Sequence, residues 1–229
     1  MIAAILSQGL RDISIFVAII YILSALAVIM LTLPIHEWAH AFAATKLGDP
    51  TPRFQGRLSL NPFAHIDWLG AACILLFGWG WAKPVGINAR YFKNPKVGMA
   101  ITAFAGPLSN IVVATISMFL LYLITFLFGL DKVIVFYAYM FFYYIAQINI
   151  SLAVFNLIPI PPLDGSRLLS AFLPDKYYYK LMRYERYLFI AVLVLIWVGV
   201  LDAPIAFLSG KIMSGISFVA GLPFGLFGG

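Results

Sequence analysis

The longest apolar stretches of this chain are too long and too poor in charge to fit a soluble domain. A helix needs about 20 apolar residues to cross a hydrocarbon core of about 30 Å. Four stretches meet that length: 15–47, 97–129, 133–157 and 187–208. The chain is 63% hydrophobic and 10% charged, whereas soluble domains are about 45–50% apolar and about 25% charged. We therefore predict an all-α polytopic membrane protein in a lipid bilayer, with 1–229 as a single domain.

The stretch 53–92, between the first two predicted spans, has a different pattern. Leu58 and Leu60 alternate with polar residues, as do Val85 and Ile87, which predicts two short strands. Residues 68–82 are apolar, but the run has only 15 residues and contains three glycines, which favours a re-entrant or interfacial segment over a span. We expect a short re-entrant segment with a β-hairpin here. The Gly-rich apolar tail, 212–229, is expected to be interfacial or loosely ordered.

Basic residues predict the orientation of the spans. Twelve of the 15 Lys and Arg residues fall within 46–96 and 167–186, on one side of the predicted spans. Because basic loops stay in the cytoplasm, we expect a multi-pass protein of the cell membrane with its N-terminus outside. These few basic loops form no long stripe for nucleic acid, so anionic lipid headgroups are the simplest partner for their charge.

The first predicted span contains a candidate metal motif. His36 and His40 are four residues apart, so a helix places them on one face, close enough to share a metal ion. Glu37 follows the first histidine and can act as general base for a metal-bound water. Ionisable groups are costly in a membrane helix, which favours a functional site. The alternative is a polar turn at the helix end whose histidines are merely hydrogen-bonded. The motif lies toward the cytoplasmic end of its span.

A catalytic zinc site needs three protein ligands and one open position. Asp164 is the strongest third candidate, because it follows a proline-rich segment that cannot be a regular helix and that needs protein or a water-filled cavity around it at membrane depth. The alternative is that Asp164 caps a short helix. Such a set would hold one zinc ion per chain inside the helix bundle. Asn156 could donate to an oxyanion or make an ordinary interhelical hydrogen bond, and His65 is interpreted as a hydrogen-bonded loop residue.

Several separate motifs occur in order along the chain: His36-Glu37-x-x-His40, Gly106-Pro107-x-x-Asn110, and Asn156 followed by Asp164-Gly165. With the stretches GRLSLNPFAHID, GWAKPVGIN and NLIPIPPLDG, they resemble the site-2 protease family of intramembrane zinc metalloproteases. The chain resembles the compact prokaryotic members, without a PDZ or CBS domain. The resemblance implies zinc held by His36, His40 and Asp164, Glu37 as catalytic base and Asn156 near the oxyanion. From the residues alone, Gly106 and Asn110 are interpreted mainly as helix-packing positions.

The family role is regulated intramembrane proteolysis, so the resemblance implies cleavage of membrane-anchored regulators or peptide remnants, with room for a regulatory membrane partner. A helical substrate must be extended before attack, and the predicted strands at 57–60 or 85–88 could pair with it. The alternative function is a non-proteolytic membrane zinc-binding protein, either a sensor or transporter or an adaptor. A transporter would need more ionisable residues along a pathway, and an adaptor would be expected to lose Glu37.

Overall fold

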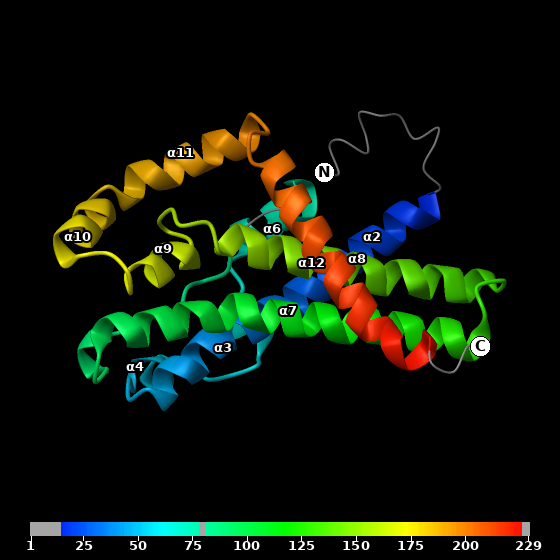
Figure 1. The fold of residues 1–229 in the computed structure, drawn as a ribbon, viewed down its shortest axis with the longest axis horizontal. Coiled ribbons are helices and arrows are strands. Elements are labelled where there is room, and N and C mark those ends of the chain that lie inside the picture. The colour runs from blue at the N-terminus through cyan, green and yellow to red at the C-terminus, as the bar shows by residue number, and fades with distance from the viewer. Residues whose placement is uncertain (1–14, 78–80, 226–229) are drawn as a thin grey trace.

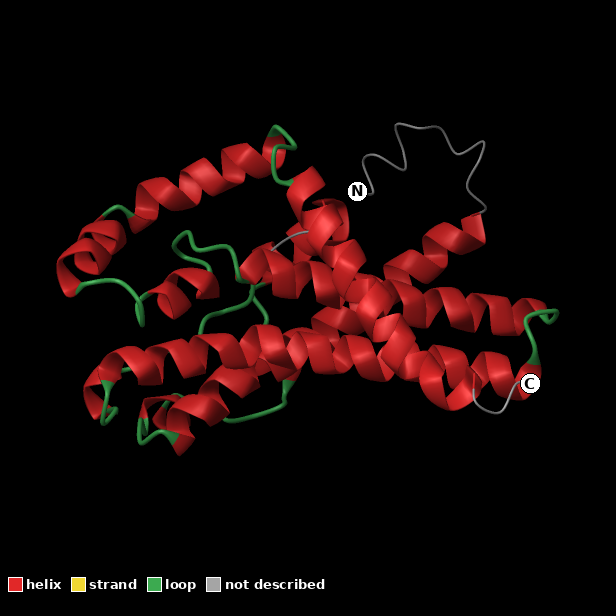
Figure 2. Cartoon of the chain, in the orientation of Figure 1, coloured by secondary structure: helices red, strands yellow, loops and turns green. Residues whose placement is uncertain are grey.

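A computed structural model describes residues 15–77 and 81–225 of the chain. In this part of the chain Figure 2 shows helices and loops and no strand. Among the described residues, four helical stretches are long and apolar enough to cross a membrane: Ile15–Lys46, Pro95–Phe128, Val133–Asn156 and Asp202–Gly225. The first three coincide with the predicted spans to within two residues at each end.

The first span contains an irregular turn just before the metal motif. It consists of α2 (Ile15–Ala27), a π-helical turn η1 (Val28–Thr32) and α3 (Leu33–Lys46). In η1 the N–H of Leu33 donates to the carbonyl of Val28, five residues earlier. The turn lies next to Pro34, which has no N–H with which to continue the α-helical pattern. Gly48, at φ +108°, then ends the helix in a conformation that favours glycine.

The centre of the fold is the helix pair α7 (Pro95–Phe128) and α8 (Val133–Asn156), which lie side by side in Figure 1. The Asn94 side chain caps α7 by accepting from the N–H of Val97. Gly129, at φ +73°, ends that helix and starts the turn to α8. α3 packs along α7, and α12 (Asp202–Gly225) crosses both α7 and α8. A buried core of Met118, Leu121, Ile150 and Ile216 joins α7, α8 and α12.

The predicted last span, 187–208, is wrong. Helix α11 (Glu185–Trp197) ends before Gly199, which has φ +78°, and α12 begins at Asp202. Asp202 therefore lies in the first turn of a helix, where the macrodipole stabilises a carboxylate, and not inside a span. The expectation of a loosely ordered tail is also wrong for 212–225, which belong to α12, and 226–229 lie outside the described residues. Glycines are tolerated in membrane helices, so the Gly-rich tail can still be helical.

The β-hairpin predicted within 53–92 is also wrong. The described part of this stretch contains short helices: the end of α4 (Thr51–Phe54), α5 (Pro62–His65), α6 (Trp68–Phe77) and the 3₁₀ turn η2 (Ala89–Tyr91). Residues 57–60 and 81–88 are irregular and pair with no strand among the described residues. α6 has ten residues, a rise of about 15 Å, which is half of a hydrocarbon core. Residues 78–80, which follow α6, lie outside the described part, so the re-entrant path of 68–82 stays a prediction.

The segment 81–88 is held by partners other than a strand. The N–H of Gly86 donates to the Gln55 side chain, and the N–H of Asn88 donates to the Asp49 carboxylate at 2.7 Å. The N–H of Lys83 donates to the His65 carbonyl. Because two side chains and the His65 carbonyl satisfy these N–H groups, the segment needs no neighbouring strand, and it is irregular despite its alternating pattern.

Candidate metal centre

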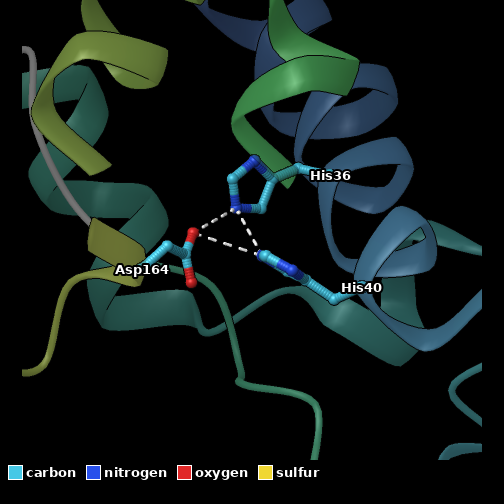
Figure 3. Close-up of side chains that lie close together, drawn as sticks. All are labelled: His36, His40 and Asp164. Atoms are coloured by element: carbon cyan, nitrogen blue, oxygen red, sulfur yellow. Dashed lines mark hydrogen bonds and ion pairs between the residues drawn. The ribbon is translucent and has the colours of Figure 1, made fainter. Parts of the chain in front are cut away.

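Three side chains from two elements converge on one point (Figure 3). His36 and His40 lie on successive turns of α3, and Asp164 is the first residue of α9 (Asp164–Leu169). The two Nε2 atoms are 3.1 Å apart. Asp164 Oδ2 lies 3.4 Å from the Nε2 of His36 and 3.2 Å from the Nε2 of His40. The structure thus brings together the three residues that we predicted as metal ligands from the sequence.

The spacing of these atoms fits a zinc ion. Zinc binds nitrogen and oxygen ligands at about 2.0–2.2 Å in a tetrahedral arrangement, which separates neighbouring ligand atoms by about 3.3–3.5 Å. The three measured separations, 3.1, 3.2 and 3.4 Å, are close to that value. Three ligands of this kind leave one tetrahedral position for water or substrate, as in catalytic zinc sites.

Asp164 reaches the histidines because the chain before it turns sharply. The N–H of Ile160 donates to the Ile158 carbonyl, and that of Leu163 donates to the Ile160 carbonyl. Leu163 has extended backbone angles and is the N-cap of α9, so Asp164 does not take the capping role that was its alternative. Gly165 packs against the end of α8, and a Cβ there would overlap the Leu157 and Ile158 carbonyls. Burial raises the pKa of the Asp164 carboxyl, but the positive charge that His40 and His36 carry when both ring nitrogens are protonated lowers that pKa well below its usual range.

Helix α7 supports both histidines from behind. His40 Nδ1 lies 2.7 Å from the Thr102 carbonyl oxygen, which can only accept, so this nitrogen carries the proton. His36 Nδ1 lies 3.3 Å from Asn110 Oδ1. Both contacts favour the tautomer that leaves Nε2 free as a metal ligand. Gly106 lies between these positions on α7, and a Cβ there would overlap both imidazole rings.

The sequence interpretation of Gly106 and Asn110 as packing positions therefore missed their contacts with the metal group. Thr102, Gly106 and Asn110 follow one another at intervals of four, so they share a face of α7. That spacing, with a buried amide in an apolar helix, is the signal that could have indicated a supporting role.

A large cavity adjoins the metal group. Its volume is about 770 Å³, and its lining includes Glu37, Asn156 and the three candidate ligands. Glu37 is buried, and one of its carboxylate oxygens accepts from the Val85 N–H at 3.2 Å. Asn156, the last residue of α8, is half-buried at the cavity wall. His65 is not part of this cluster, because it is buried at the end of α5 with Nε2 at 2.7 Å from the Ser59 carbonyl oxygen.

Comparison with known proteins agrees with this chemistry. The model of Peptidase family M50 matches residues 124–199, which contain Asn156 and Asp164. The chain is 41% identical over 181 residues to "Putative zinc metalloprotease YwhC" of Bacillus subtilis, covering 76% of this chain and 82% of YwhC. No solved structure matches the sequence.

Two more distant relatives carry similar names. The chain is 29% identical over 177 residues to "Putative zinc metalloprotease Rip2" of Mycolicibacterium smegmatis, covering 73% of this chain and 64% of that protein. It is 28% identical over 175 residues to "Zinc metalloprotease MJ0392" of Methanocaldococcus jannaschii, covering 76% of this chain and 40% of that protein. Since the alignment to YwhC spans most of both chains, this protein belongs to peptidase family M50, the site-2 protease family, and is a membrane zinc metalloprotease.

Proposed function

We propose that this protein is an intramembrane endopeptidase that cleaves transmembrane segments of membrane-anchored regulators or peptide remnants. The observation that carries the proposal is the position of Glu37. It lies between two candidate zinc ligands on a helix long enough to span a membrane, and it faces a cavity that can admit a peptide. A carboxylate beside a metal group can act as a base in hydrolysis. Without such a function, its burial in a membrane helix would only cost free energy.

Each residue of the metal centre has a distinct part in this reaction. His36, His40 and Asp164 would hold one zinc ion per chain, which when bound acidifies water and polarises a carbonyl at neutral pH. Glu37 takes the proton from the attacking water and delivers it to the leaving amine. Asn156, at the wall of the same cavity, donates from its side-chain amide to the oxygen on which negative charge develops.

The substrate must lose its helical hydrogen bonds before attack, and segment 81–88 supports that step. Its residues Trp81, Pro84, Val85 and Ile87 line the cavity beside Glu37. The segment belongs to no helix and is anchored through Gly86 and Asn88. We infer that an unwound stretch of substrate lies along it, with its carbonyl turned toward the metal centre.

The corrected last span leaves the inferred orientation unchanged. With Asp202–Gly225 as the fourth span, the basic clusters at 46–96 and 167–186 still flank the same side of the membrane. Basic loops favour the cytoplasmic side, which supports an active site that faces the cytoplasm of a cell membrane.

The proposal is tested by cleavage of a panel of tagged single-span substrates by purified protein in liposomes. Wild type is compared with Glu37→Gln, and with Asp131→Asn as a matched amide control in the exposed turn between α7 and α8. We expect wild type and the control to cleave, and Glu37→Gln to retain zinc without cleaving. Retained zinc with no cleavage in any variant would favour a non-proteolytic zinc protein, and wild type free of zinc would refute the metal centre.

A further inference from the structure

The cavity beside the metal centre also contains positive charge that the proposed reaction does not use. Arg167 of α9, Arg183 of α10 (Asp175–Arg183) and Arg186 of α11 all line it. We refer to these three residues as the arginine wall. Beyond Glu37 and Asp164, the one carboxylate among the described lining residues is that of Glu185. With three guanidinium groups and this single carboxylate, this wall of the cavity has a net positive charge.

The arginine wall is not explained by pairing within the protein. In the described part of the chain, no carboxylate lies within ion-pair distance of these three guanidinium groups, since the contacts within that distance are those of Asp164 with the two histidines. Arg167 is half-buried three residues after Asp164, whereas Arg183 and Arg186 are exposed. The wall therefore extends from near the metal group to the solvent-accessible opening of the cavity. Guanidinium groups in such a setting favour a carboxylate, with which they form two parallel hydrogen bonds.

The general preference for basic residues on the cytoplasmic side does not account for this arrangement. Lys176 and Lys180 belong to the same helix as Arg183 and are exposed, yet they do not line the cavity. In Figure 1, α10 and α11 extend from the bundle beside α9, which carries Asp164. The three arginines thus come from three successive helices and meet at the one cavity that holds Glu37.

We propose that the arginine wall binds acidic side chains of the substrate that lie just outside its apolar span. The inference rests on the proposed function, because its occupant is the peptide that reaches Glu37. Apolar lining residues such as Phe189, Val192 and Ile196 suit the membrane part of that peptide. The arginines suit Asp or Glu where the peptide leaves the bilayer. A peptide is favoured over a lipid headgroup because the wall shares its cavity with the catalytic carboxylate.

The test measures binding separately from cleavage. Glu37→Gln protein in nanodiscs of zwitterionic phosphatidylcholine is titrated with fluorescent single-span peptides flanked by three Glu, three Gln or three Lys. We expect the Glu-flanked peptide to bind about ten-fold more tightly than the Lys-flanked one, since each partly exposed ion pair changes an equilibrium by up to about five-fold. Adding Arg183→Glu and Arg186→Glu should reverse the order, and adding Arg183→Gln and Arg186→Gln should abolish it. The matched charge reversal Lys180→Glu should leave it unchanged.

Equal binding of the three peptides would overturn the inference, even if wild type cleaves all of them. An effect of the arginine variants that appears only with anionic phosphatidylglycerol, and not with peptide charge, would assign the wall to lipid and also overturn it. Charge-dependent binding that follows the arginines supports the inference. If wild type then cleaves none of the bound peptides, the proposed protease function is refuted, while the arginine wall remains a binding site for acidic side chains.

Discussion

Asn110 Oδ1 lies 3.3 Å from the Nδ1 atom of His36, although the two residues are 74 positions apart in the chain. Asn110 is 1% exposed, and its Nδ2 has no protein partner in the described structure. Burying an amide with an unpaired N–H group costs free energy. We therefore interpret Asn110 as the residue that holds the His36 imidazole in position. The contact directs Nε2 of His36 toward His40 and Asp164.

Removal of the Asn110 amide should therefore weaken metal binding. For Asn110→Ala we expect zinc affinity to fall about 10- to 100-fold, because partners of this kind typically contribute that much. Competition with a chelator of known affinity measures it. Asn149→Ala is the matched control, since Asn149 is an equally buried amide that contacts Thr32 and Ile145 instead of a metal ligand. An equal loss in both variants would indicate a folding effect and contradict the role of Asn110.

Gly106 allows α7 to approach the two histidines. A Cβ at this position would overlap both imidazole rings, so Gly106→Ala should displace them and lower zinc content severely. Gly215→Ala on α12 makes the same change where nothing lies within 4 Å, and it should keep its zinc and fold normally. Zinc per chain by elemental analysis, with the melting temperature as a fold control, distinguishes them. Full zinc content in Gly106→Ala would show that the helix spacing is looser than described.

Asn156 should matter for rate and not for metal binding. Asn156→Ala removes an amide from the cavity wall without touching a candidate ligand. Loss of one oxyanion donor costs about 100- to 1000-fold in kcat, and we expect a loss of that order with zinc content unchanged. If Asn156 only packed between helices, kcat would change little while the melting temperature fell. Single-turnover cleavage and elemental analysis on the same preparation separate the two roles.

Asp49 is not one of the candidate metal ligands, and it anchors segment 81–88. It is fully buried and accepts from the N–H groups of Thr51 and Asn88. Asp49→Asn turns one acceptor into a donor, which should cost about 1–3 kcal/mol of stability. Because the segment lines the cavity, we expect KM to rise more than kcat falls, with zinc retained. Asp67→Asn is the control, because Asp67 caps the N-terminus of α6 in a similar way. An unchanged KM would separate the segment from substrate binding.

The metal centre was largely predictable because its main signals are local. The spacing of His36 and His40 follows the helix period, and the prolines before Asp164 exclude a continuous helix there. The contact between Asn110 and His36 was not predictable in this way, since it depends on how α7 packs against α3. Metal ligands with a local sequence signal are thus easier to infer than the residues of a neighbouring helix that hold those ligands in position.

The errors have a similar origin. Alternation at Val85 and Ile87 predicted a strand. The N–H groups of the segment bond instead to Asp49, Gln55 and the His65 carbonyl, which only the folded chain brings together. The last span was misplaced for a different reason. Gly199, followed by Asp202 in a first helical turn, marks a helix end and a new start, and the continuous apolar character of the sequence hid both signals.

The revised last span can be checked by cysteine labelling, because Cys73 is the single cysteine of the chain and can first be replaced by alanine. Val200 is exposed in the turn between α11 and α12, whereas Gly215 lies inside α12 with open space around it. If α12 spans the membrane, Val200→Cys should react with a membrane-impermeant maleimide from the cytoplasmic side. Gly215→Cys should react only after detergent is added, because lipid surrounds it. The opposite pattern, with Val200→Cys shielded and Gly215→Cys accessible from outside, would restore 187–208 as the span.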